Sequence, residues 1–457
     1  MSSLPVNVYR VAFSHWSHVQ EQLAQMIQDY AAACSALKMA LEILPVDYPS
    51  HDQRAEAFSG LDSQLSILAS HERALQEARL SLTTARNASD NLAPINSLPI
   101  EILSAIFVSA IQRGVDEICN LTLVCKEWRQ ITLQAPACWS KIELPIGPND
   151  SRAFDRVYLW AERAQNQQLH LSIWERLHMV PEFEYGEDTV DEVADMLAPL
   201  MSRIHTMEFR AHSMEMHGFV PKLLGCWVEH GSAGTAKALK LDIPQKRMTV
   251  HLTAGYDSAM QDYGLTTDDY KAFFGSLRVL SLGNVKLDRE LGFYSGLVDL
   301  CLGPLGRYNR YTRWDVAAIL EASPGLRSLA IVGLEITIDW SDTSEPSAVA
   351  LNNLNELRLE SNTSPKNFWT VLRMITSTSD SIQVSLTPED HPEFMPAARL
   401  FFERFKVTAL YIHAPYFGSC PVISPLFVRM PHLEHLAIQN CPIFDSNWPN
   451  GPTSANF

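Results

Sequence analysis

The chain has 457 residues, of which 46% are hydrophobic and 19% are charged, and its formal net charge at pH 7 is −16. The length predicts two or three domains. The apolar fraction predicts a folded protein and excludes a disordered chain, which would be poorer in apolar residues and denser in charge. The acidic balance, together with the lack of a Lys and Arg cluster, argues against nucleic acid as the main partner.

The sequence also bears on compartment and cofactors. The eight cysteines are scattered, without a CxxC pair or an accompanying His series, so the ligand pattern of a zinc site is missing. We find no signal peptide and no run of about 18 apolar residues. We therefore expect a protein of the cytoplasm or nucleus with no membrane partner, no metal and no cofactor.

Two apolar seams with near-heptad spacing predict two helices within residues 1–88, separated by Pro45 and Pro49. Glu72 and Arg79 interrupt the second seam, and residues 1–17 show no usable pattern. Such short seams favour an antiparallel helical hairpin within one chain, while a bent coiled coil that dimerises the protein is the alternative. The seams consist of Val19, Leu23, Met26, Tyr30, Cys34, Leu37, Leu41 and Leu44, then of Phe58, Leu61, Leu65, Leu68, Leu75 and Leu82.

A polar, turn-rich linker at residues 87–96 leads into three short predicted helices. Pro99 fits the first position of the first helix, where a missing N–H costs nothing. The second and third helices follow at residues 116–123 and 124–134, and Pro136 ends the last. Helices this short cannot hide all the apolar side chains they carry, so some must face a partner or the rest of the chain. The plainer alternative is a helical subdomain packed on its neighbours.

This segment resembles an F-box, most closely the version common in mushroom-type fungal proteins. Residues 98–103 (LPIEIL) with Ile106-Phe107 match the opening of that family, residues 124–129 (VCKEWR) match its second signature, and Pro136 with Trp139 match its close. Cys138 and Thr132 stand where the family usually has Leu and Ala, but neither change removes an anchor. The match covers about a ninth of the chain.

The F-box resemblance implies a docking module. F-boxes bind the adaptor Skp1, which joins them to a cullin–RING ubiquitin ligase. Apolar and aromatic anchors usually dominate the energy of such interfaces, but the sequence cannot separate anchors that face the adaptor from those that hold the helices together. The expected Skp1-binding residues, at the matched motif positions, are Leu98, Pro99, Ile102, Leu103, Ile106, Val124, Cys125, Trp128 and Trp139.

Beyond residue 140 the sequence alternates between predicted strands and helices. Residues 141–144 and 168–173 predict strands, with a helix at residues 155–164 between them. Further on a pattern recurs in which an apolar residue is followed three and five positions later by two more. It is clear from Leu277, Leu297, Leu326, Leu354 and Leu433, and less clear from Ile204, Ala236 and Val407.

The first three steps between clear starts are 20, 29 and 28 residues, similar to the leucine-rich repeat with its period of about 20 to 29. Each unit of such a repeat supplies one strand to a parallel sheet in a curved solenoid. The pattern is irregular, with an expected inserted loop at residues 244–269. Asn284 and Asn440 are the nearest approximations to the asparagine that closes regular repeats. A non-repeating α/β domain is the alternative, and the residues from Pro442 on suit a cap, a disordered tail or a truncated gene model.

No catalytic pattern stands out. The sequence has no phosphate-binding Gly-rich loop before a helix and no GxSxG. His432 and His435 lie within a repeat and are expected to be solvated. A ligase that transferred ubiquitin itself would need the Cys and His series of a RING or a reactive Cys in a dedicated domain. We therefore expect an adaptor or receptor subunit and no enzyme.

The predicted fold class is α/β, with an N-terminal helical hairpin or coiled coil at residues 1–88, a three-helix F-box at 89–145 and an irregular leucine-rich-repeat-like solenoid with a parallel sheet at 146–457. This favours the substrate-recognition subunit of a Skp1–cullin–F-box (SCF) E3 ubiquitin ligase. Its F-box would dock Skp1 and, through it, cullin, while the solenoid holds an unknown protein target for ubiquitin-dependent catabolism. The alternatives are a non-catalytic interaction scaffold without target turnover and an enzyme with a cryptic site.

The concave face of a solenoid is its usual recognition surface. Residues between the strand anchors are expected to line it and to form a recognition zone. That zone comprises Arg278, Ser281, Asp299, Cys301, Arg327, Ser328, Ala330, Asn355, Glu356, Arg358, Glu434 and His435.

Overall fold

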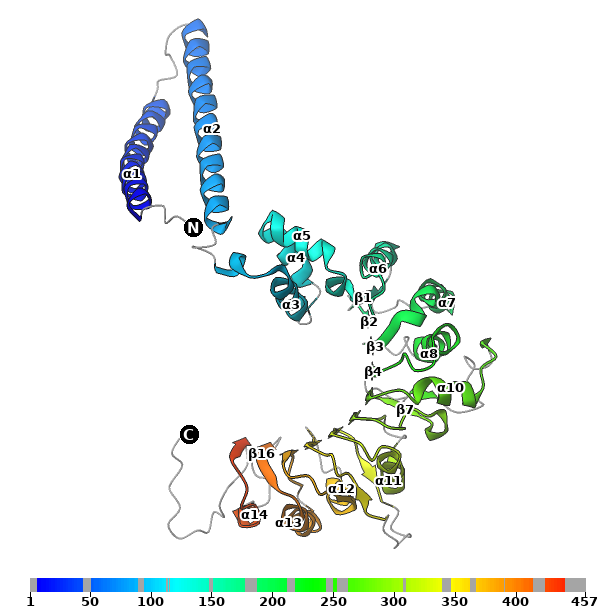
Figure 1. Cartoon of the computed structure of the whole chain (residues 1–457). Helices are drawn as coiled ribbons and strands as arrows, with labels where there is room; N and C mark the ends of the chain where they lie inside the picture. Colours follow the sequence, from blue (N-terminus) through cyan, green and yellow to red (C-terminus); the bar gives the residue numbers. More distant parts are fainter. Residues whose placement is uncertain are drawn as a thin grey trace. The chain divides into compact units, whose positions relative to one another are not determined.

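The computed structural model describes residues 6–43, 51–88, 94–111, 114, 116–147, 151–176, 187–211, 218–243, 250–252, 262–306, 310–338, 347–361, 367–389, 391–413 and 424–439. The chain forms two compact units, Met1–Ser97 and Leu98–Phe457 (Figure 1). Asn440, the tail from Pro442 and much of the expected loop at 244–269 lie outside the described residues.

The first unit contains two long helices of 38 residues each, α1 (Val6–Ile43) and α2 (His51–Ala88), and the short 3-10 helix η1 (Pro94–Ser97). Both predicted helices are present. α1 extends into the region without a usable pattern, where the rings of Tyr9 and Phe13 stack at 5.8 Å between centroids.

Side chains of the two predicted seams are largely exposed. Tyr30 and Leu37 on α1 retain 47% and 48% of their accessible surface, and Phe58 and Leu65 on α2 retain 65% and 52%. The expected burial of one seam against the other is therefore absent from the described helices. Heptad spacing sets the apolar face of a helix, but it does not decide which helix covers that face.

The second unit begins with three short helices and a 3-10 turn: α3 (Ile100–Ile111), α4 (Asp116–Val124), α5 (Lys126–Gln134) and η2 (Pro136–Trp139). The three predicted helices are therefore present within a few residues of their expected bounds. Leu103, Phe107 and Ile111 on α3 are buried with Ile118 on α4 and Ile131 on α5. These five side chains belong to the small core of the bundle.

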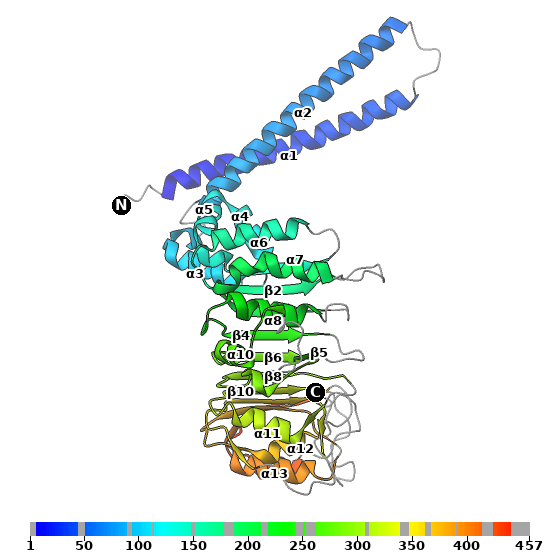
Figure 2. The ribbon, with the colours of Figure 1, turned by 90° about the vertical axis from the view of Figure 1, so that its right-hand side faces the viewer.

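An eleven-stranded parallel sheet follows, in the order β1-β2-β3-β4-β6-β8-β10-β13-β15-β16-β17 (Figure 2). Each strand pairs with the next sheet strand along the sequence, as short crossovers through a helix or loop require. The strands are β1 (Lys141–Ile146), β2 (Leu169–Glu175), β3 (Ile204–Arg210), β4 (Ala238–Asp242), β6 (Val279–Gly283), β8 (Asp299–Leu302), β10 (Ser328–Val332), β13 (Glu356–Glu360), β15 (Ile382–Leu386), β16 (Val407–His413) and β17 (His435–Gln439).

Helices cover one face of this sheet (Figure 1). The segments that connect the strands of the large sheet also pair with one another through very short parallel strands. These pairs are β5 (Val250–Leu252) with β7 (Val285–Leu287), β9 (Tyr311–Thr312) with β11 (Ile336–Thr337), and β12 (Val349–Ala350) with β14 (Ile375–Thr376). The helices are α6 (Ser151–Arg163), α7 (Glu187–Leu197), η3 (Ala198–Arg203), α8 (Phe219–His230), α10 (Thr267–Phe274), η5 (Arg289–Leu291), α11 (Arg313–Glu321), α12 (Phe368–Met374), α13 (Phe394–Arg404) and α14 (Ser424–Phe427).

All eight predicted apolar triplets coincide with strands of the parallel sheet. Their anchors line up in register, as Leu280 with Leu300 and Leu329 with Leu357 show, and all four of these side chains are buried. One strand, β15, was not predicted, because the position that begins its triplet is the polar, exposed Ser381. The C-terminal part is thus a mixed α/β structure built on one large parallel sheet.

Candidate functional site

The first signature of the predicted docking segment begins just outside α3. The carbonyl oxygen of Pro99 accepts hydrogen bonds from the backbone N–H groups of Ile102 and Leu103, both at 3.0 Å. Pro99 therefore caps the helix, which starts at Ile100, instead of occupying its first position as the sequence suggested. Its side chain is exposed, whereas that of Leu98 is half-buried.

Helix α3 divides the remaining residues of this signature between two faces. Leu103 is 2% exposed and lies in the bundle core with Phe107. Ile102 and Ile106, one turn apart and each adjacent in sequence to a core residue, keep 49% and 42% of their surface exposed. Their exposure leaves an apolar flank on α3 that the described part of the chain does not cover.

The second signature forms the junction between α4 and α5. Val124 is 51% exposed at the end of α4. Cys125 follows as the N-cap of α5, and its Sγ accepts a hydrogen bond from the N–H of Trp128 at 3.4 Å. The Trp128 ring packs on Phe107 with 4.7 Å between centroids. Cys125 is half-buried, and the structure gives it a capping role that the signature did not reveal.

Trp139 closes the bundle and joins it to the sheet. It is 3% exposed, and its Nε1–H donates to the carbonyl oxygen of Thr132 at 2.9 Å. Its ring meets Trp160 of α6 edge-on at 5.5 Å, and the Arg163 guanidinium lies 4.4 Å from its centroid. Trp139 is thus sealed inside this chain, between α5 and α6.

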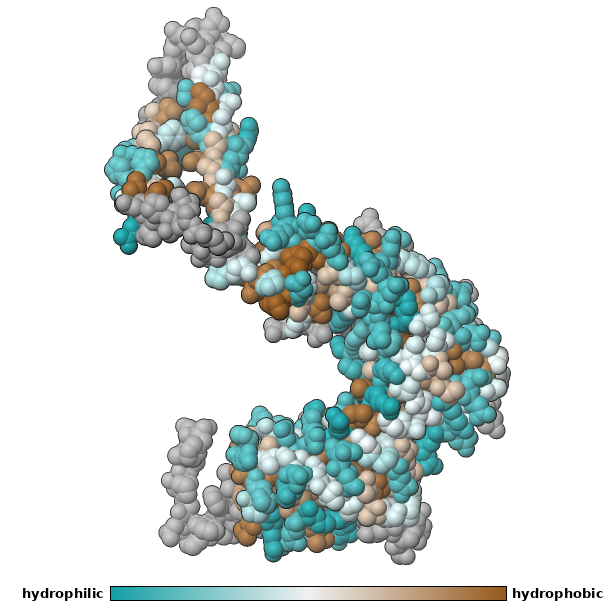
Figure 3. Space-filling model, viewed as in Figure 1, coloured by the Kyte–Doolittle hydropathy of each residue, from teal (hydrophilic) through white to brown (hydrophobic). Residues whose placement is uncertain are grey.

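Six large apolar side chains on these helices are more than 40% exposed, and we call them the apolar docking face. Figure 3 shows hydrophobic residues gathered over α3, α4 and α5. Three members, Ile100, Leu123 and Leu133, were not among the predicted site residues; only Leu133 lies in a predominantly polar helix, where its apolar character was a usable signal. The face comprises Ile100, Ile102, Ile106, Leu123, Val124 and Leu133.

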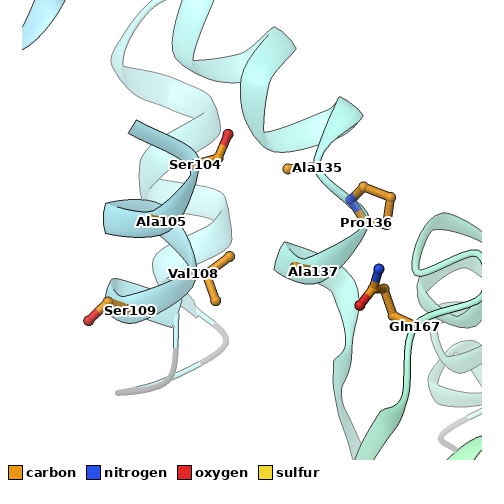
Figure 4. A pocket seen from close by; sticks show the side chains of 8 residues that line it. All are labelled: Ser104, Ala105, Val108, Ser109, Ala135, Pro136, Ala137 and Gln167. Atoms are coloured by element: carbon orange, nitrogen blue, oxygen red, sulfur yellow. The ribbon is translucent and has the colours of Figure 1, made fainter. Parts of the chain in front are cut away.

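A separate groove of about 450 Å³ lies on the other flank of α3 (Figure 4). Its lining is mostly apolar, and most of its side chains are small. They belong to α3, to the segment around η2 and to the turn before β2, and they are Ser104, Ala105, Val108, Ser109, Ala135, Pro136, Ala137 and Gln167.

The open face of the sheet carries paired charges near its first strands. The carboxylate of Glu208 lies 3.5 Å from His170 Nε2 and also pairs with Arg210. His170 has the largest effect and lowers the pKa of Glu208 to about 2, burial opposes the shift, and Arg210 adds to it. A similar pair forms between Arg358 and Glu360. Burial has the largest single effect and favours a higher pKa for Glu360, but hydrogen bonds from Arg358 and Ser385, together with the nearby positive charge, outweigh it and lower the pKa.

The predicted recognition zone is only partly available on this open face. Ala330 is 6% exposed, so the expectation that it lines an exposed surface is wrong, because its small side chain is overlaid by its neighbours. Cys301 is half-buried, and burial raises the pKa of its thiol. Arg278, Arg327 and Arg358 are exposed as expected.

Comparison with protein families gives one match, to an F-box-like domain at residues 95–145. These bounds enclose α3, α4, α5 and η2, together with all nine predicted site residues. No curated protein matches the sequence. An F-box-like domain suggests Skp1 binding in SCF-type complexes, and F-box proteins are generally adaptor subunits rather than enzymes.

Two further searches concern the described residues alone. Among them, we find no group of three or more His, Cys, Asp or Glu side chains placed to hold a metal ion. None of the helices in the described ranges is both long and apolar enough to span a membrane.

Proposed function

We propose that this chain is the substrate-recognition subunit of a Skp1–cullin–F-box E3 ubiquitin ligase. The observation that carries the proposal is the apolar docking face, which stays exposed at F-box positions such as Ile102, Ile106 and Val124. Exposed apolar clusters of this kind usually mark protein interfaces. Helices of the adaptor would cover this face and bury it.

The nine predicted Skp1-binding residues then take two roles. Pro99, Ile102, Ile106 and Val124 are exposed and would contact the adaptor directly. Leu103 and Trp139 are buried, and Leu98, Cys125 and Trp128 are half-buried, so these five would act by holding the exposed ones in position. Substitutions in the second group would weaken docking only through the stability of the helices.

The sheet would hold the target. We interpret it as an irregular leucine-rich-repeat-like solenoid, since its strands follow one another in parallel order and their anchor leucines align. Asn284 supports this interpretation: it is fully buried, and its Oδ1 accepts a hydrogen bond from the Gly306 N–H at 2.9 Å, which links two successive units. The proposed domains remain 1–88, 89–145 and 146–457, with an F-box of the mushroom-type version.

The chain would contribute to ubiquitin transfer by proximity, since holding two reactants together converts an intermolecular step into an effectively intramolecular one. The open face of the sheet offers the paired charges Glu208 with Arg210 and Arg358 with Glu360 for selecting a target. In this proposal no residue of the chain takes part in forming the bond between ubiquitin and the target.

Co-expression of the full chain with Skp1 tests the docking. We expect a stable complex with the unaltered chain, loss of the complex with Ile106→Glu, and retention with Ser104→Glu, a matched control on the groove flank of the same helix. Loss with Ser104→Glu and retention with Ile106→Glu would place the adaptor in the groove and overturn the assignment.

Target turnover distinguishes a ubiquitin-ligase subunit from an interaction scaffold. Proteins that co-purify with the chain should rise in level when the proteasome is inhibited or when the Ile106→Glu variant replaces the unaltered chain in cells. A chain that binds Skp1 while no co-purifying protein changes in level would instead be an interaction scaffold.

A further inference from the structure

The N-terminal helices carry a second, independent apolar surface. Eighteen large apolar side chains on α1 and α2 are exposed by 42% to 67%. At about 80 to 100 Å² each, they present roughly 1,500 Å² per chain, nearly twice what one partner buries in a standard interface. A surface this large on a soluble helix pair needs a partner.

The apolar residues of α1 form two rows. The first, which we call the seam row, advances by alternating steps of 4 and 3 along the whole helix, and Gln20 is its one strongly polar member. The seam row comprises Tyr9, Phe13, Trp16, Gln20, Leu23, Ile27, Tyr30, Cys34, Leu37 and Leu41. The second, which we call the flank row, repeats every seven residues and comprises Ala12, Val19, Met26, Ala33 and Ala40.

The sequence of α2 matches the seam row in an antiparallel register, although the described helices leave both seams largely exposed. If the two helices close in this register, residues whose numbers sum to 95 face each other, which would set Trp16 opposite Arg79 as a cation–π pair and Leu23 opposite Glu72. The remaining layers are Leu37 with Phe58, Cys34 with Leu61, Tyr30 with Leu65, Ile27 with Leu68, Gln20 with Leu75 and Phe13 with Leu82. Such closure would cover the seam row and still leave the flank row uncovered.

A face that is apolar at three of seven positions is typical of helical bundles, whereas a single coiled-coil seam needs only two. In α1 the third position is the flank row, where Val19 is 42% and Met26 is 60% exposed. One α2 helix cannot cover both rows, so α1 requires a second neighbour.

The flank row complements itself. When two α1 helices run antiparallel with Met26 at the two-fold axis, Ala12 faces Ala40 of the second copy and Val19 faces Ala33 of the second copy. The largest side chain meets its own copy at the centre, and small residues lie towards both ends. Self-complementarity about a two-fold axis is what an isologous dimer interface requires.

We propose that two copies of this chain dimerise through α1, with their flank rows antiparallel about Met26 and the α2 helices completing a four-helix bundle. The proposal is independent of the adaptor-docking assignment, since none of these residues belongs to the F-box-like match at 95–145. A dimer would present two copies of the target-binding sheet, so that a target with two binding segments would gain affinity through effective concentration.

Sedimentation equilibrium of the full chain tests the proposal. We expect a dimer mass at micromolar concentration, and a dissociation constant weakened about a hundredfold or more by the pair Val19→Glu and Met26→Glu, which places four carboxylates in an apolar interface. Ser14→Glu with Gln28→Glu is the matched control, since both positions are exposed on the opposite side of α1. Circular dichroism of both variants checks that helix content is kept.

Three results would overturn the proposal: a monomeric unaltered chain, equal weakening by both pairs of substitutions, or a dimer that survives Val19→Glu with Met26→Glu while helix content is unchanged. Skp1 co-purification is measured on the same samples. A chain that fails to dimerise yet binds Skp1 would overturn the dimer proposal alone. A dimer that fails to bind Skp1 would overturn the docking assignment alone.

Discussion

The double substitution Ile102→Ala with Ile106→Ala should weaken adaptor binding while leaving the fold intact. Fully burying an isoleucine side chain contributes about 1.5 to 3 kcal/mol. Because Ile102 and Ile106 are 49% and 42% exposed in the free chain, docking can bury only about half of each. We therefore expect a loss of about 1 kcal/mol per residue, or about 2 kcal/mol together, which corresponds to a dissociation constant roughly 30 times larger.

Isothermal titration of the purified chain with Skp1 measures this change, and thermal unfolding measures its cost in stability. Leu103→Ala provides the contrast, because Leu103 is 2% exposed and its truncation should lower the free energy of unfolding by about 2 to 5 kcal/mol. Ser104→Ala on the opposite flank should not change the dissociation constant and should have little effect on stability. A dissociation constant for the double variant within about threefold of the unaltered chain would refute the assignment of these isoleucines to the interface.

Three other predictions concern stability. Trp139→Ala should lower the free energy of unfolding by about 3 to 5 kcal/mol, measured in urea, because it opens a cavity beneath Trp160 and frees the Thr132 carbonyl. Asn284→Ala should cost about 1 to 3 kcal/mol by the same measurement, since it leaves the buried Gly306 N–H without this acceptor. The folded pKa of Glu208, about 2, lies below its ordinary value of 4.5, so its stabilisation is present above pH 4.5 and lost as the pH falls towards 2. Glu208→Gln should therefore reduce the difference between the urea midpoints of unfolding measured at pH 7 and at pH 3. An equal difference in the variant and in the unaltered chain would contradict this prediction.

The sequence located the three helices of the F-box-like match but could not sort their residues. Ile102 and Leu103 are adjacent apolar residues of similar size, and both fit a helical period. Their exposures differ because Leu103 points at Phe107 and the other helices, while Ile102 points away from them. That distinction depends on how three helices cross, and no local pattern encodes the crossing.

The strands of the sheet could be predicted wherever apolar anchors marked them. The prediction failed for the one strand in which an anchor position is polar. Ser381 stands at the first anchor position of β15, so the triplet was incomplete although Val384 and Leu386 are fully or almost fully buried. The start of α1 was missed for a different reason: Tyr9, Phe13 and Trp16 had no regular seam before them, and only their continuity with Leu23 reveals the period.

The connection between the docking helices and the sheet bears on how a bound target would be delivered. Helices α3–α5 and the sheet belong to one compact unit, and η2 alone, Pro136–Trp139, separates α5 from β1 apart from single residues at each end. Proximity is most effective when the reacting groups are held in a defined geometry, and a flexible linker lowers the effective concentration. Trp139 lies in this connection, wedged between Thr132 and Trp160 under the Arg163 guanidinium. A buried aromatic ring at this point would fix the sheet relative to a partner that covers the apolar docking face, which accounts for a buried residue at an F-box position.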